Sequence, residues 1–190
     1  YNHVVGICYR CKSQIEPVIS EQWFVKVALL VKAAKEAVVK GQTKFNAPRF
    51  KKIYLHWLDN LRDWNISRQI VWGIKIPIDG ETDTFDTWFS SGQWPFATLQ
   101  TTNTGDFETY YPTSVMNTAY DILPFWVMRM MMLGIYVTGK VPFETVLIHG
   151  LVRDKEGQKI SKSKGNVIDP LEMVDKYGSD ALRMTLIWGG

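Results

Sequence analysis

Two short apolar segments on either side of a long apolar stretch place the strongest constraint on the fold of this chain. The segments TSVMNTAY (residues 113–120) and TVLIHG (residues 145–150) are typical of buried strands, and residues 122–136 between them are long and apolar enough for a helix. Strand, helix and strand at this spacing form a βαβ unit, which joins parallel strands. We therefore predict an α/β fold with a parallel sheet. A further extended segment, TFDTWF (residues 84–89), is predicted before it.

Two amphipathic helices are predicted upstream of that unit. The first has a buried face formed by Val27, Leu30, Val31, Ala34 and Val38, and Gly41 is its expected end. The second begins near Pro48 and ends at residues 63–65, with a buried stripe of Phe50, Ile53, Tyr54, Trp57, Leu58 and Leu61. A turn at Asp79–Gly80 follows. One helix is expected to begin at Asp169–Pro170, and Ser179–Asp180 is expected to cap another.

The N-terminal segment contains two cysteines, Cys8 and Cys11, in a C-x-x-C spacing between strand-forming residues, which predicts a β-ribbon. A structural zinc site needs four ligands, the pair supplies two, and His3 adds at most a third, so we expect no zinc. Two reduced thiols in a small knuckle are the simpler interpretation. The chain starts with Tyr1 instead of Met, and we expect a segment upstream of it.

Charge and hydropathy exclude little. The formal net charge is +3, which permits binding to a polyanion without requiring it. No stretch reaches the roughly 18 apolar residues of a membrane span, so no membrane association is expected.

The most specific motif is GQKISKSKGNVIDP (residues 157–170). A charge run is ordinarily a solvated loop, but this string resembles the KMSKS signature of class I aminoacyl-tRNA synthetases, with Ile160 at the Met position. The resemblance implies that Lys159 and Lys162 are catalytic, because loop lysines can stabilise the charge that grows on departing pyrophosphate. It also implies that Ser161, Lys162 and Ser163 contact ATP.

Three further segments carry the same resemblance. In IHGLVRD (residues 148–154) it implies that adenosine lies on His149 and Gly150, with the backbone of Ile148 and Leu151 nearby, although His149 alone would read as structural. In AYDILPFWVMRM (residues 119–130) it implies an amino-acid site. Asp121 would bind the substrate's α-ammonium group, and Ile122 and Trp126, one helical turn apart, would shape the pocket.

The opposite wall of that pocket is expected in DTFDTWFSSGQWPF (residues 83–96), at Trp88, for which simple core packing is the alternative. Within the family, DTWFSS with WPF, and DI-x-x-FW with RM, are similar to the valine-specific members. The isoleucine enzymes tend to have Asp at the position of Ser90 and Gln at that of Ile122. A pocket of two Trp and one Ile would exclude isoleucine and admit threonine, which is isosteric with valine.

The resemblance spans nearly the whole chain and implies its organisation. Residues 1–24 would be a β-ribbon returning from an editing insertion. Residues 25–168 would be the second half of a Rossmann-like nucleotide-binding parallel sheet and its helices, and residues 169–190 the start of a helical stem-contact region. The connection between Pro77 and Asp83 is shorter than in many relatives, and a natural compact form and an engineered replacement both remain open.

The resemblance also implies the substrates and partners. These would be L-valine, ATP with Mg²⁺ and tRNA(Val), in the cytoplasm, without a tightly bound cofactor or protein-held metal. No H-x-G-H string occurs here, so the first half of the catalytic domain and the editing domain are expected elsewhere in a longer chain, and these residues alone are expected to be inactive. An isoleucine enzyme and a non-catalytic RNA-binding or assembly module derived from a synthetase remain the alternatives.

Overall fold

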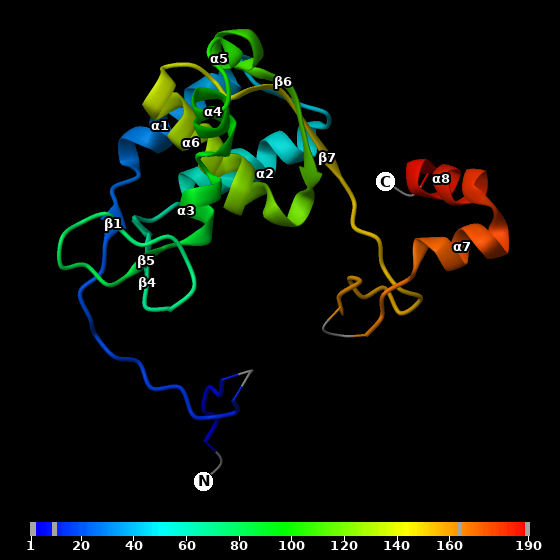
Figure 1. The fold of residues 1–190 in the computed structure, drawn as a ribbon, viewed down its shortest axis with the longest axis horizontal. Coiled ribbons are helices and arrows are strands. Elements are labelled where there is room, and N and C mark those ends of the chain that lie inside the picture. Colours follow the sequence, from blue (N-terminus) through cyan, green and yellow to red (C-terminus); the bar gives the residue numbers. More distant parts are fainter. Residues whose placement is uncertain (1–2, 9–10, 163–164, 189–190) are drawn as a thin grey trace.

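A parallel sheet organises the fold (Figure 1). The computed structural model describes residues 3–8, 11–162 and 165–188. Within them, β2 (Lys44–Phe45), β7 (Phe143–His149) and β6 (Thr113–Ala119) form a sheet in the order β2-β7-β6. Both strand pairs are parallel, which confirms the prediction of a parallel sheet.

One helical segment joins β6 to β7, as the βαβ pattern predicts. It begins with a 3₁₀ turn, η1 (Tyr120–Ile122), and a π-helical turn, η2 (Leu123–Val127), before α6 (Met128–Thr138). The chain leaves α6 through Gly139, whose φ of 73° suits glycine. Methionines fill much of its buried surface: Met128, Met130, Met131 and Met132 are each at most 1% exposed.

The helical segment Tyr120–Thr138 has 19 residues and contains an 18-residue window with a mean hydropathy of 1.2. By length and composition alone it could cross a bilayer, contrary to the expectation from apolar runs. Half of this window is buried inside the protein, which is the usual condition of a core helix.

The two upstream helices are confirmed as α1 (Ala28–Val39) and α2 (Pro48–Asp59). Helix α1 buries Leu30, Ala34, Ala37 and Val38 and packs against α6. Helix α2 starts at Pro48 but ends at Asp59, earlier than predicted. Its stripe is also narrower than predicted, because Ile53 and Trp57 are 42% and 43% exposed.

The predicted strand at residues 84–89 is wrong beyond its first two residues. Strand β5 (Thr84–Phe85) is followed directly by α3 (Thr87–Ser91), because the Asp86 carboxylate accepts a hydrogen bond from Trp88 N and caps a helix there. Two more short helices, α4 (Trp94–Thr101) and α5 (Asp106–Tyr110), lead to β6.

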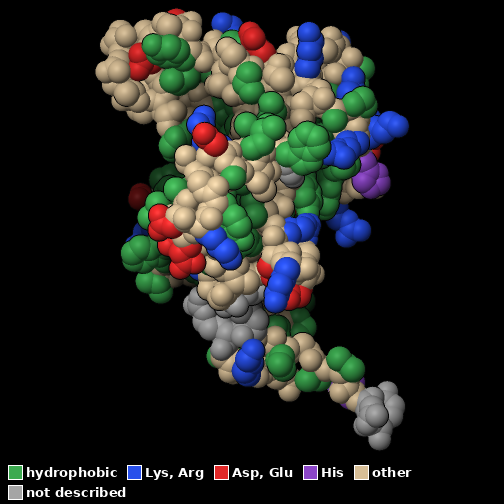
Figure 2. Space-filling model, turned by 90° about the vertical axis from the view of Figure 1, so that its right-hand side faces the viewer, with side chains coloured by type: hydrophobic (Ala, Val, Ile, Leu, Met, Phe, Trp, Pro, Cys, Tyr) green, Lys and Arg blue, Asp and Glu red, His purple; other side chains and the backbone are tan. Residues whose placement is uncertain are grey.

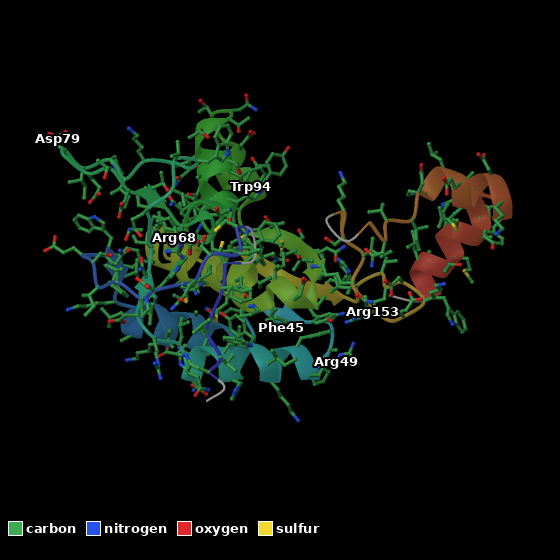
Figure 3. The ribbon with its side chains drawn as sticks, turned by 90° about the horizontal axis from the view of Figure 1, so that it is seen from below. Phe45, Arg49, Arg68, Asp79, Trp94 and Arg153 are labelled. Atoms are coloured by element: carbon green, nitrogen blue, oxygen red, sulfur yellow. The ribbon has the colours of Figure 1, made fainter. Side chains whose placement is uncertain are left out.

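Short antiparallel pairs connect these parts. Strand β1 (Phe24–Val25) pairs with β3 (Trp64–Asn65), and β4 (Ser67–Arg68) pairs with β5. The predicted turn at Asp79–Gly80 is confirmed, with a φ of 82° at Gly80. Figure 3 shows Asp79 at the tip of this projecting turn.

The two ends of the chain extend away from the sheet (Figure 1). Helix α7 (Pro170–Tyr177) is capped by Asp169, whose carboxylate accepts from Leu171 N at 2.9 Å, as predicted. It packs on α8 (Ser179–Trp188), which leaves Ile187 and Trp188 exposed. At the other end, the predicted β-ribbon amounts, within the described residues, to one bridge between Ile7 and Gln14.

The face shown in Figure 2 carries Lys, Arg and His side chains along one margin, with exposed hydrophobic side chains beside them. Exposed apolar groups of this kind are common on protein surfaces when they are scattered, and significant when they are contiguous.

Candidate functional site

The candidate site lies at the carboxyl ends of β6 and β7. In the register of the sheet, Ala119 at the end of β6 is the partner of His149 at the end of β7. Asp121 therefore follows one strand at the same edge where residues 151–167, which we call the lysine loop, follow the other. Ligands of open α/β sheets bind at this edge.

An ion pair joins two of the predicted site residues across this edge. Lys159 Nζ lies 2.6 Å from Asp121 Oδ2, and the two side chains are 56% and 28% exposed. They are 38 positions apart in the sequence, so the sheet and the loop together bring them into contact.

Asp154 and Asn166 shape the lysine loop from within. The Asp154 carboxylate accepts from Gln158 N at 2.7 Å and from Asn166 Nδ2 at 2.6 Å. The Asn166 side-chain oxygen accepts from Ser161 N at 2.8 Å. The predicted contact Lys162 is exposed in this loop, and Ser163 lies outside the described residues.

Arg153 ties the loop back to the end of β6. Its guanidinium donates to Tyr120 Oη at 2.7 Å and to Gly157 O at 2.8 Å. Figure 3 shows Arg153 between the body of the protein and the helices α7 and α8. Sequence reasoning missed this role, although Arg153 belongs to the IHGLVRD segment that marks the strand end.

The predicted adenosine-binding residues lie at the end of β7 and directly after it. The His149 ring Nδ1 lies 2.6 Å from Gly150 O, and both residues are exposed, whereas Leu151 is half-buried. The Ile148 side chain is buried in the core, so only its backbone faces neighbouring polar groups. The Asn46 side chain forms two hydrogen bonds with that backbone. Its Nδ2 donates to Ile148 O at 3.0 Å, and its Oδ1 accepts from Ile148 N at 3.1 Å.

The two predicted tryptophan walls are connected through helix α3. The Trp88 ring stacks on Phe125 with a centroid distance of 5.7 Å and an interplanar angle of 29°. The Trp126 indole N–H donates to Ser91 O, at the end of α3, at 3.2 Å. Ile122, in η1, is half-buried.

A cavity of about 530 Å³ adjoins this region between α4, α5 and β6. Among the described residues that line it, Trp126 belongs to the predicted set, together with Trp94, Met116 and Met130. Trp88, Asp121 and Ile122 do not line it. The predicted pocket walls are thus neighbours, but they do not enclose one cavity in this structure.

The cysteine pair is distant in sequence from this edge. Cys8 and Cys11 are free thiols, and hydrogen bonds to Ser13 lower the pKa of Cys11 to about 7. In the described part of the chain no cluster of three or more His, Cys, Asp or Glu side chains could hold a metal ion.

Comparison with known proteins gives a consistent family. The family model for tRNA synthetases class I (I, L, M and V) matches residues 7–79 and 78–189. The chain is 46% identical over its full length to the valine–tRNA ligase of Dehalococcoides mccartyi and 50% identical to that of Streptomyces coelicolor. It spans only 24% of each of these relatives.

The alignment with a relative is longer than this chain. It runs over 216 positions with the D. mccartyi protein, whereas the chain has 190 residues. The family match is divided at residues 78–79, within the connection from Pro77 to Asp83 that is short in this sequence.

Solved structures share the fold at low sequence identity. Mycobacterium tuberculosis methionyl-tRNA synthetase bound by methionyl-adenylate aligns with a TM-score of 0.72 at 18% identity, covering 96% of this chain and 36% of that one. An Agrobacterium radiobacter LeuRS in a ternary complex with tRNA aligns with a TM-score of 0.54 at 21% identity, covering 68% of this chain and 24% of that one. The family match over nearly the whole sequence, together with the parallel sheet and the lysine loop at its carboxyl edge, shows that this chain belongs to the class I aminoacyl-tRNA synthetases, in the group of the isoleucine, leucine, methionine and valine enzymes.

Proposed function

We propose that this chain is the second half of the catalytic domain of a valine–tRNA ligase. That enzyme activates valine with ATP and transfers it to tRNA(Val). The observation that carries the proposal is the contact between Lys159 and Asp121, which joins the lysine loop to the end of β6 at the ligand-binding edge of the sheet. The identity of 46–50% to valine–tRNA ligases over the whole chain supports valine as the amino acid.

The lysines act on the phosphates of ATP, which binds with Mg²⁺ as substrate. When the valine carboxylate attacks the α-phosphate, pyrophosphate leaves and negative charge grows on it. Lys162 is exposed on the loop and free of the ion pair that engages Lys159, so it can reach the departing group first. Lys159 assists after it leaves Asp121, and Ser161 and Ser163 bind the nucleotide beside them.

Asp121 receives the α-ammonium group of valine. Its carboxylate already forms an ion pair with a cation in this structure, because Lys159 Nζ lies 2.6 Å from Asp121 Oδ2. The substrate's ammonium group is a donor of the same charge and can take that place. Trp88, Ile122 and Trp126 form the walls for the branched side chain.

The adenosine lies on His149 and Gly150, with the backbone of Ile148 and Leu151 alongside. The remaining parts belong to the longer enzyme: the first half of the catalytic domain with its phosphate-binding histidine motif, and the editing domain, from which residues 1–24 return. Residues 25–168 complete the catalytic domain, and residues 169–190 begin the region that contacts the tRNA stem. The enzyme acts in the cytoplasm, where aminoacylation serves protein synthesis.

The test is ATP–pyrophosphate exchange by the longer enzyme that carries this chain, with valine, isoleucine or no amino acid added. We expect exchange that depends on valine, and transfer of valine to tRNA(Val). Exchange that prefers isoleucine would assign the chain to the isoleucine enzymes. Absence of exchange with any amino acid, in an enzyme that still binds tRNA, would identify a non-catalytic binding module and refute the proposal.

A further inference from the structure

Asp86 is a buried carboxylate at the start of α3, and three groups converge on it. Its Oδ2 accepts from Trp64 Nε1 at 2.9 Å and lies 3.2 Å from the Arg68 guanidinium. Its Oδ1 accepts from Trp88 N at 3.4 Å. The residue is only 6% exposed. A carboxylate is buried at a high cost unless it is paired and hydrogen-bonded, so these partners have to be held in place together.

A second cation approaches the same cluster from helix α6. The Arg129 guanidinium carbon lies 3.8 Å from the centroid of the Trp64 ring, and the Asp86 charge acts on it through space. Arg129 Nε and Nη1 are buried and find no hydrogen-bond partner among the described residues. The Asp86 charge and the face of Trp64 are therefore the compensation that the structure provides for this guanidinium.

Helix α3, which Asp86 caps, carries or contacts both predicted tryptophan walls. Trp88 is its second residue, and the Trp126 indole N–H donates to Ser91 O at its last residue. The end of the helix also packs closely against α6. A Cβ placed on Gly92, directly after it, would lie 2.8 Å from Trp88 O and 2.9 Å from Leu133 Cδ1.

Helix α3 is too short to be stable without contacts to the rest of the protein. Five residues are well below the length at which a helix is stable in isolation. Besides its cap, α3 is anchored where Asp86 N donates to Ile66 O at 2.7 Å. The side chain and backbone of Asp86 thus fix the start of α3 to Trp64, Arg68 and Ile66, which precede it by 18 to 22 positions.

We propose that Asp86 is a positioning residue for the amino-acid pocket: it fixes α3, and through α3 it sets the separation of Trp88 and Trp126. This inference rests on the proposed function and extends it, since it assigns selectivity among small branched amino acids to a carboxylate that does not touch the substrate. Misplacement of a pocket wall by about 1 Å can lower kcat/KM by up to about a hundredfold.

The experiment compares variants of the longer enzyme in ATP–pyrophosphate exchange. Asp86→Asn keeps the side-chain volume and the helix cap but loses the charge and the second acceptor for Trp64 and Arg68. Arg68→Gln removes one partner at the rim of the cluster, where the Arg68 side chain is 39% exposed. Asp59→Asn is the matched control, because Asp59 is an exposed carboxylate whose ion pair with Lys35 lies outside the cluster.

For Asp86→Asn we expect kcat/KM for valine to fall by about tenfold or more, with KM for ATP unchanged. Discrimination of valine against threonine and isoleucine should fall with it. Arg68→Gln should change the same quantities in the same direction by less, and Asp59→Asn should leave them unchanged. Far-UV circular dichroism and the thermal midpoint report whether each variant is folded.

Three results would overturn the inference. A folded Asp86→Asn enzyme with unaltered valine kinetics and selectivity would do so, and so would equal losses for valine and ATP, which mark a general structural defect. If Asp86→Asn does not fold, Arg68→Gln decides, and unchanged valine selectivity in it refutes the inference. If the enzyme without any substitution shows no valine-dependent exchange, the proposed function itself is refuted, and the inference that rests on it is refuted too.

Discussion

Lys159 Nζ lies 2.6 Å from Asp121 Oδ2, so the lysine loop is joined by an ion pair to the acidic residue that follows β6. Both side chains are partly exposed, and an ion pair of this kind contributes at most about 1 kcal/mol. A bound ligand can therefore replace it at little expense. If Asp121 binds the ammonium group of valine, substrate binding releases Lys159 toward the phosphates.

Asp121→Asn in the longer enzyme should weaken valine binding by about 1.5–3 kcal/mol, because one charge-assisted hydrogen bond is lost. ATP binding should be nearly unaffected. Separate calorimetric titrations with valine and with ATP measure both. A loss for ATP alone would assign Asp121 to the nucleotide, and equal losses would indicate a folding defect.

Lys162→Ala should lower the rate of adenylate formation far more than it lowers valine affinity, because the charge that Lys162 meets develops in the transition state. Pyrophosphate exchange and valine titration provide the two numbers. Lys155→Ala is the control on the same loop, since Lys155 is highly exposed and lies next to Glu156. Equal exchange rates in the two variants would remove Lys162 from its role.

Asn46→Ala should destabilise the purified chain by about 1–3 kcal/mol, because the N–H and C=O of the buried Ile148, next to the end of β7, both lose their partner. Urea unfolding measures the change. Asn60→Ala removes an exposed amide that donates to His56 O and should have a smaller effect. Comparable losses in both variants would show that Asn46 does not secure the strand end.

Cys11 should react with iodoacetamide as an acidic thiol. The Ser13 hydroxyl and backbone stabilise its thiolate and lower its pKa to about 7, so the alkylation rate should rise through pH 7 and level off above pH 8. Ser13→Ala should move this rise to higher pH. Peptide mapping by mass spectrometry separates Cys11 from Cys8, and a rate that rises only above pH 8 in the unaltered chain would contradict the prediction.

The 190 residues alone should not support valine-dependent pyrophosphate exchange at a useful rate. In-line displacement needs the triphosphate held from both sides, and the chain supplies the lysine loop without an H-x-G-H motif. The purified chain and its Lys162→Ala variant are compared in the exchange assay. Exchange clearly above background that the substitution abolishes would show that this half holds a working site.

Local sequence determined those parts of the fold whose signals lie within a few residues. Pro48 starts α2, Asp169 caps α7, and Gly80 allows the turn that follows Pro77. Apolar runs of the right length predicted β6, the helical segment after it and β7. Caps, fixed φ angles and hydrophobic periodicity act over one or two helical turns, so they can be read without knowledge of the neighbours.

The prediction for residues 84–89 failed because strand propensity competed with a cap. Thr84 and Phe85 do form a strand, but Asp86 then finds Trp64 and Arg68, and its remaining oxygen caps α3. The local sequence, an Asp followed by Thr-Trp-Phe, is compatible both with the end of a strand and with the start of a helix. Whether it ends a strand or starts a helix depends on partners that tertiary packing supplies.

The same limit applies to the candidate site. The sequence by itself identified the lysine loop and, through family resemblance, the residues expected to serve it. Only the tertiary structure decided that Lys159 meets Asp121 across 38 positions and that Asn46 holds Ile148 across 102. Contacts at such separations form when parallel strands place their carboxyl ends at one edge, and no local pattern encodes the register that brings particular side chains together.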